Sequence, residues 1–104
     1  MGKQTRQRPE RLPGKLLEIR QKLGLSQNGM VRRMALEDLI ERDYISKFER
    51  GTLEPSLWVL LQYARAANVF VDVLIDNDLA LPQKLPASPK SEGIRRKRSS
   101  HNKS

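Results

Sequence analysis

Apolar residues recur at helical spacing in the first half of the chain. The first set is spaced by four, three and four residues, which places it on one face of a helix: Leu12, Leu16, Ile19 and Leu23. Pro13 suits the first turn of such a helix, and Gly24 stands where a left-handed C-terminal cap belongs. The pattern therefore predicts a helix that begins near residue 12 and ends near residue 23.

A second and a third helix are expected after Gly24. Ser26 is placed to cap the N-terminus of the second helix, whose apolar positions are Met30, Val31 and Met34. The third helix holds Ile45 and Phe48 on its buried side and ends at Gly51. Because the two apolar residues of this helix are three positions apart, the residues around them point outward.

Two more helices complete the pattern. Pro55 and Ser56 restart the chain into a fourth helix, which buries Leu57, Leu60, Leu61 and Ala64. Asn68 is suited to a left-handed cap, and a short fifth helix is expected from about Val71 to Ile75. No run of alternating apolar and polar residues is long enough to favour a sheet. The expected fold class is all-α.

The two ends of the 104-residue chain differ from its middle in composition and charge. Residues 1–11 carry four basic residues and one acidic residue, a net charge of +3, and lack apolar periodicity. Residues 82–104 are rich in proline, serine and lysine and have a net charge of +6. Residues 12–81 have a net charge of −1. We therefore expect one folded domain, 12–81, between a disordered basic arm and a disordered basic tail.

Composition argues against several classes of function. The absence of cysteine excludes disulfides and cysteine-based zinc sites, and the single histidine, His101, lies in the expected tail, so no metal or cofactor is expected. The apolar stretch from Leu57 to Leu81 is broken by polar and charged residues and cannot span a membrane. The carboxylates between Glu37 and Asp43 suggest no pocket for acid–base chemistry, so an enzyme is not expected.

Three blocks of sequence, in this order, resemble one known family. They are Leu-Gly-Leu-Ser-Gln at residues 23–27, Ile-Ser-Lys-Phe-Glu-Arg-Gly at residues 45–51 and Glu-Pro-Ser-Leu at residues 54–57. Together they are similar to the Cro/C1-type (XRE-type) helix-turn-helix proteins, and the resemblance covers residue 12 to about residue 76. It implies a five-helix, lambda-repressor-like DNA-binding domain.

The resemblance implies roles for individual side chains. Ser26 and Gln27 would contact a phosphate at the start of the second helix, where free N–H groups and the helix dipole favour an anion, and Gln27 could instead brace the third helix. The outward residues of the third helix would enter the major groove: Arg42, Asp43, Tyr44, Ser46 and Lys47. Arg50 and Thr52 match positions that contact backbone phosphates.

The resemblance also implies a structural ion pair and shows one departure. Glu49 is expected to be buried and paired with Arg20 of the first helix. Four residues more than the usual number separate Gln27 from Glu49, and Ala35 stands near the place of the usual turn glycine. We expect either a longer second helix or a longer loop between residues 34 and 42. Either change would move the carboxylates of this stretch away from DNA.

A dimer interface is expected on the fourth and fifth helices. The apolar residues that fall outside the expected core stripe are Trp58, Val59, Phe70 and Val73. Proteins that read two half-sites as symmetric dimers need such a surface. The alternative is a larger monomer core, with residues 76–81 folded over it.

These features favour sequence-specific binding of double-stranded DNA by a homodimer. We expect a transcriptional regulator, a repressor or autoregulator, in the prokaryotic cytoplasm at the nucleoid. A second hypothesis is a protein-interaction module, such as an antitoxin or an adaptor, that uses the acidic stretch and the apolar surface of the last two helices. A third is nonspecific coating of nucleic acid by the basic tails.

Overall fold

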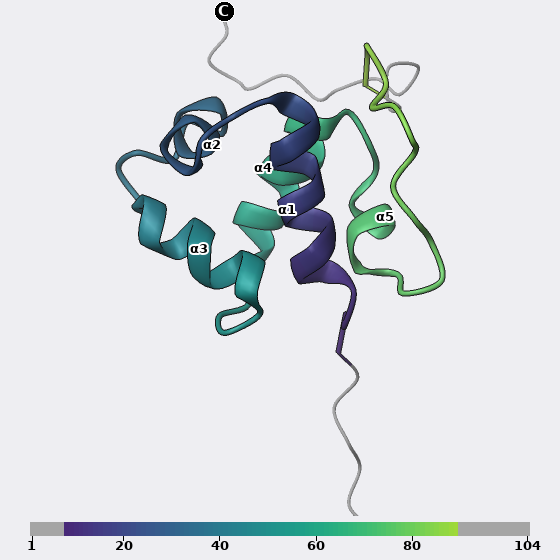
Figure 1. Ribbon diagram of the computed structural model, residues 1–104, viewed down its shortest axis with the longest axis horizontal. Coiled ribbons are helices and arrows are strands. Elements are labelled where there is room, and N and C mark those ends of the chain that lie inside the picture. The colour runs from purple at the N-terminus through teal and green to yellow at the C-terminus, as the bar shows by residue number, and fades with distance from the viewer. Residues whose placement is uncertain (1–7, 90–104) are drawn as a thin grey trace, which may run out of the picture.

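The computed structural model describes residues 8–89, and this part of the chain consists of helices joined by turns and loops (Figure 1). Residues 1–7 and 90–104, most of the predicted arm and tail, lie outside the described residues. The five helices are α1 (Leu12–Leu23), α2 (Gln27–Arg33), α3 (Arg42–Arg50), α4 (Leu57–Ala67) and α5 (Val71–Ile75). No strand occurs between residues 8 and 89, so the predicted all-α class is confirmed.

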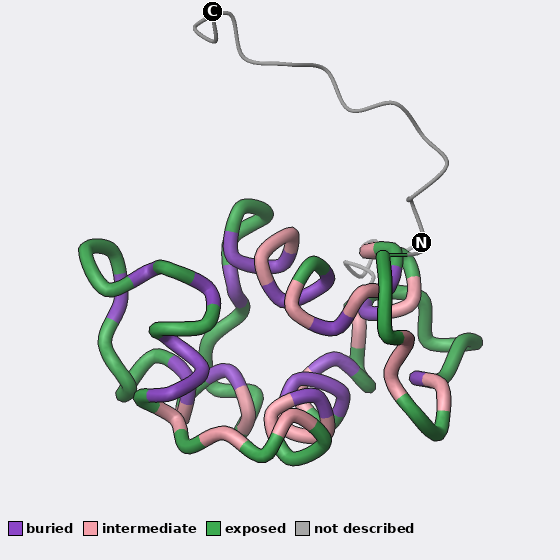
Figure 2. Tube along the Cα trace, turned by 90° about the horizontal axis from the view of Figure 1, so that it is seen from above, coloured by how far each residue is buried: buried purple, intermediate pink, exposed green. Residues whose placement is uncertain are grey.

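Helix α1 lies at the centre of the fold. It packs against α3, α4 and α5, while α2 packs against α3 (Figure 1). Figure 2 shows the buried residues on the inner sides of the helices and the exposed ones mainly at the outer turns and loops. The core takes at least one fully buried side chain from each helix, among them Leu16, Ile19, Met30, Ile45, Tyr63 and Leu74. Burial of these side chains is the main source of stability in a domain of this size.

The helix ends follow the predicted caps. Ser26 Oγ accepts from the Gly29 N–H at 2.9 Å, and Ser56 Oγ accepts from the Val59 N–H at 3.3 Å. Gly24 closes α1 in the left-handed region with a φ of 70°, and Asn68 closes α4 with a φ of 60°. The helices α1, α2 and α4 therefore begin or end at the capping residues that the sequence predicts.

The connection between α2 and α3 is a longer loop, not a longer helix. Helix α2 ends after seven residues, and residues 34–41 form the linker to α3. Ala35 has a φ of 57°, its N–H donates to Arg32 O, and the Leu36 N–H donates to Val31 O. This pair of hydrogen bonds is a Schellman motif, which ordinarily has glycine at the position of Ala35. Of the two expected conformations, the longer loop is the one that forms.

Replacing Ala35 with glycine is expected to stabilise the protein. A left-handed conformation costs a residue with a Cβ about 1–2 kcal/mol, whereas glycine adds about 0.5–1 kcal/mol of unfolded-state entropy. The Ala35→Gly variant should therefore gain about 0.5–1 kcal/mol in the free energy of unfolding, measured by urea denaturation. As a control, Ala66→Gly inside α4 should lose about 1 kcal/mol. A loss of stability in Ala35→Gly would contradict the left-handed turn.

Backbone and side-chain contacts hold α5 and both ends of the described chain against α1. The buried Lys15 donates through Nζ to Val73 O at 2.7 Å and to Asp76 O at 2.9 Å. Arg11 donates through its N–H to Asn77 Oδ1 at 3.1 Å, and Asn77 Nδ2 donates to Arg8 O at 3.1 Å. The N-terminal segment therefore contacts the domain from residue 8, four residues before the predicted boundary.

The chain after α5 also returns to the domain and runs along α1 toward its C-terminal end (Figure 1). Leu81 is buried, and Leu85 packs against the core. Lys22 Nζ donates to Pro82 O and Gln83 O, and Asn68 Nδ2 donates to Pro86 O at 2.8 Å. The predicted boundary at residue 81 is therefore too early, because the contacts continue to residue 86.

The predicted dimer interface needs correction at two of its four residues. Val59 is 5% exposed and belongs to the core, and Val73 packs against that core. Buried Leu81 adds to the same core, as the monomer alternative expected. Trp58 and Phe70 remain on the surface, 54% and 45% exposed. The prediction that Leu57 is buried with Leu60 is also wrong, because Leu57 is 85% exposed in the first turn of α4. The pattern missed Val59 because α4 packs on two neighbours, α1 and α5.

Candidate nucleic-acid interface

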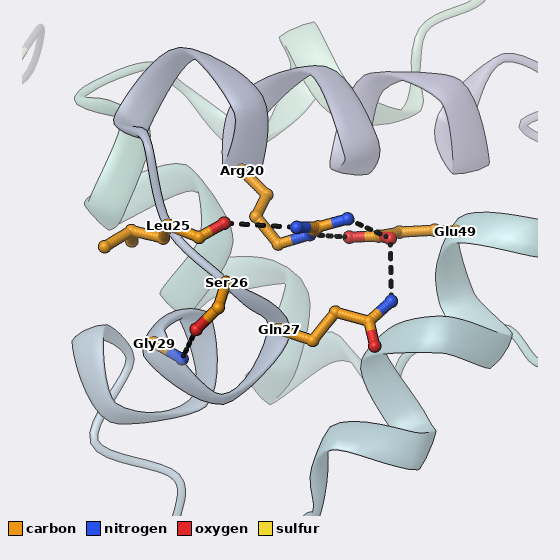
Figure 3. A network of polar contacts seen from close by, with 6 residues as sticks. All are labelled: Arg20, Leu25, Ser26, Gln27, Gly29 and Glu49. Carbon is orange, nitrogen blue, oxygen red and sulfur yellow. Dashed lines mark hydrogen bonds and ion pairs between the residues drawn. The ribbon is translucent and has the colours of Figure 1, made fainter.

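A polar network fixes α3 relative to α1 and α2 (Figure 3). Arg20 Nε donates to Glu49 Oε2 at 2.6 Å, and Arg20 Nη2 donates to Glu49 Oε1 at 3.0 Å. The side chains of Arg20 and Glu49 are only 18% and 6% exposed. The ion pair implied by the resemblance is therefore present as a bidentate contact, the geometry in which arginine binds carboxylate most specifically.

Two further contacts extend this network to the start of α2. Arg20 Nη1 donates to Leu25 O at 3.1 Å, just before the Ser26 cap. Gln27 Nε2 donates to Glu49 Oε1 at 3.3 Å, so Gln27 braces α3, one of its two expected roles (Figure 3). The sequence carries no signal for Leu25, because it acts through a main-chain carbonyl. One carboxylate thus holds the end of α1, the start of α2 and the last turn of α3 together.

Electrostatics at this junction favour a single ion pair. The hydrogen bond to Glu49 raises the pKa of Arg20, so the guanidinium stays charged. Burial, followed by the charge of Glu49, raises the pKa of Tyr63 above its ordinary value. The tyrosine therefore remains neutral at physiological pH and places no additional charge beside the pair. The charged Arg20 and the neutral Tyr63 both favour the Arg20–Glu49 ion pair, which holds α3 in place.

The predicted base-reading residues share the outer surface of α3. Ile45 and Phe48 are buried, which turns the other residues of the helix outward. Exposed among the predicted residues are Arg42, Asp43, Tyr44 and Lys47, whereas Ser46 is half-buried. These four exposed side chains supply two cationic groups, one carboxylate and one phenol, and Arg50 adds a third cationic group at the end of α3.

The predicted phosphate-contacting residues lie at two places. Arg50 and Thr52 are exposed at the end of α3, where the Thr52 hydroxyl donates to Lys47 O at 3.3 Å. Ser26 stands at the start of α2, and its hydroxyl is occupied by the Gly29 N–H. A Cβ on Gly29 would lie 3.1 Å from Ser26 Oγ, a tight contact that a small shift of the serine side chain would have to relieve. The observed role of Ser26 is therefore that of the N-cap of α2.

The linker carboxylates lie beside basic residues of α2 and α3. Glu37 and Glu41 line one hollow together with Arg32 of α2 and Arg42 at the start of α3. Glu41 is the residue that immediately precedes α3. The linker turns back at buried Ile40 and so returns its acidic residues to the beginning of the helix. The surface near the N-terminus of α3 therefore mixes both signs of charge.

The chain was compared with models of known protein families, with curated proteins and with solved structures, and none of the three comparisons finds a match. In the described part of the chain, no helix has the length and apolar character needed to cross a membrane. Residues 8–89 also contain no group of three or more metal-binding side chains placed around one point. The interface must therefore be interpreted from its own geometry.

Proposed function

We propose that this chain is a transcriptional regulator that binds specific sequences in double-stranded DNA, acting as a repressor or autoregulator at the prokaryotic nucleoid. The observation that carries the proposal is the arrangement of α3. Its polar surface is exposed, and its position is fixed by the Arg20–Glu49–Gln27 network. A helix held in this way can enter the major groove, which is wide enough for one helix.

The exposed side chains of α3 suit the chemistry of base edges. Arg42 and Lys47 can donate to the O6 and N7 atoms of guanine, and Asp43 can accept from the N4 amino group of cytosine. Ser46 can serve either kind of base. Ser26 at the start of α2, Arg50 in the last turn of α3 and Thr52 after it would contact phosphates and orient the protein without reading sequence. Gln27 supports them by bracing α3 through Glu49.

We further propose that the protein binds as a homodimer. Trp58 and Phe70 are the two members of the predicted interface that remain exposed, and Leu57 beside Trp58 is 85% exposed. Leu57 and Trp58 lie at the N-terminal end of α4, and Phe70 follows its C-terminal end. Exposed large apolar side chains at both places favour a contact with another molecule. A symmetric pair of domains would present two copies of α3 to two half-sites.

Selection from a random duplex library with the full chain tests both proposals. We expect enrichment of an inverted repeat, and each of Arg42→Ala and Lys47→Ala should lose about 1–3 kcal/mol of discrimination at one base pair. Lys84→Ala is the matched control, because it removes an exposed cationic side chain from the segment after α5, which carries neither the proposed reading surface nor the proposed dimer surface. The control should select the same repeat.

Other results of this selection would contradict the proposals in different ways. Enrichment of a single half-site would overturn the proposal of a homodimer but would leave the proposal of a transcriptional regulator standing. If the full chain neither enriches nor binds any duplex, the proposal of a transcriptional regulator is wrong. Exposed Leu57 and Trp58 then favour the antitoxin or adaptor function, in which a protein partner covers this surface. A gene for a small toxin beside this one would support the antitoxin.

A further inference from the structure

The linker between α2 and α3 presents an apolar side chain to solvent at the start of α3. Leu36 and Ile40 are 2% and 8% exposed, and they anchor the two ends of a short turn. The N–H groups of Leu39 and Ile40 both donate to Leu36 O, at 2.9 and 3.0 Å. Leu39 lies between the anchors and is 64% exposed. Its backbone is therefore fixed while its side chain faces outward.

Leu39 is close to an exposed aromatic residue of α3. Leu39 and Tyr44 line the same hollow. Tyr44 is the third residue of α3 and 42% exposed, and its ring packs edge-on against Phe48 at 6.3 Å between centroids. The contact with buried Phe48 restricts the tyrosine ring. The two exposed side chains therefore border the same hollow at the N-terminal end of α3, and we call this pair the Leu39–Tyr44 surface.

The charges around this surface limit what it can contact. Glu37, Asp38 and Glu41 line the hollow with Leu39 and Tyr44 and no basic residue does, whereas Arg32 and Arg42 line the neighbouring hollow on the other side of Glu37 and Glu41. A phosphate placed there would be repelled by the carboxylates. The major-groove edges of bases differ, since thymine presents a C5-methyl group and adenine and cytosine present amino groups that carboxylates can accept from. An apolar surface bordered by carboxylates matches base edges, not the sugar–phosphate backbone.

We propose that the Leu39–Tyr44 surface reads a thymine by packing against its C5-methyl group. This inference rests on the proposed function and deepens it, because it assigns a base to residues of the longer linker. In helix-turn-helix proteins the N-terminal residues of the reading helix contact base edges, and this surface lies at that end of α3. The linker then extends the reading surface beyond α3 itself.

Replacement of thymine by deoxyuridine tests the proposal, because it removes only the methyl group. In the duplex selected by the full chain, each thymine is replaced in turn and the dissociation constant is measured. We expect at least one replacement to weaken binding roughly fourfold, the effect of one buried methyl group. The Leu39→Ala variant should bind the unmodified duplex more weakly and lose most of its sensitivity to that replacement. Leu79→Ala, an exposed leucine after α5, should keep the sensitivity.

The outcomes separate this inference from the function on which it rests. If the selection yields no sequence and the full chain binds no duplex, both the thymine contact and the proposed DNA-binding function are wrong. A selected duplex in which no deoxyuridine weakens binding overturns the methyl contact alone. The same follows if Leu39→Ala keeps the full sensitivity of the unaltered chain. Because Leu39 is exposed, thermal unfolding of the variant should match that of the unaltered protein, which shows that lost sensitivity is not lost folding.

Discussion

The Glu49→Ala variant should lose about 3–5 kcal/mol in the free energy of unfolding, the cost of breaking one side of a buried ion pair. Glu49 accepts from Arg20 twice and from Gln27 once. Its removal leaves a guanidinium that is only 18% exposed without its acceptor. Since the same carboxylate joins α1, α2 and α3, the loss affects the relative placement of all three helices as well as global stability.

Chemical denaturation followed by circular dichroism measures this loss. The matched control is Glu18→Ala, which removes a carboxylate of the surface pair with Lys22 at 3.2 Å. That side chain is 44% exposed, so the control should lose less than about 0.5 kcal/mol. A Glu49→Ala variant no less stable than the control would show that the pair does not hold the domain together in solution.

The second large effect is expected at Lys15, which joins α1 to α5. Lys15→Met keeps the length of the side chain but removes the donor to Val73 O and Asp76 O. Hydrogen bonds from charged groups contribute about 1.5–3 kcal/mol each, and burial lowers the pKa of Lys15, so part of this gain offsets desolvation. We expect a net loss of about 2–3 kcal/mol, concentrated in α5 and the residues after it.

Hydrogen exchange locates this second effect. In Lys15→Met the amides of Leu74 and Asp76 should exchange faster, while those of α2 and α3 keep their protection. Lys22→Met is the control, because Lys22 also donates to two carbonyls but lies on the surface. If the α5 amides keep their protection in Lys15→Met, other contacts, such as those of Asn77 with the N-terminal segment, hold α5 in place.

The helices and their caps were predictable because their signals are local. Ser26 and Ser56 cap the next turn, and Gly24 and Gly51 adopt positive φ at the ends of α1 and α3. The outward positions of α3 follow from Ile45 and Phe48, which are three residues apart and therefore share the buried face of the helix. Such features depend on neighbours within four residues and are therefore visible in the sequence.

The remaining features depend on contacts distant in sequence. Lys15 looks like a surface lysine until the chain returns with Val73 and Asp76, 58 and 61 residues later. Val59 could not be assigned to the core before the packing of α4 on α1 and α5 was known. The place of Glu37 and Glu41 beside Arg32 and Arg42 could not be assigned before the burial of Ile40 in the linker was known.

The linker has a consequence for how this protein can diversify. Its first end is closed by the Schellman motif at Ala35 and its second by buried Ile40, so the fold depends on the anchors and little on the residues between them. The exposed positions 37–39 can accept substitutions at almost no cost in stability. Under the proposed reading role of Leu39, duplicated copies of the gene would acquire new recognition by changing three loop residues while every helix stays the same.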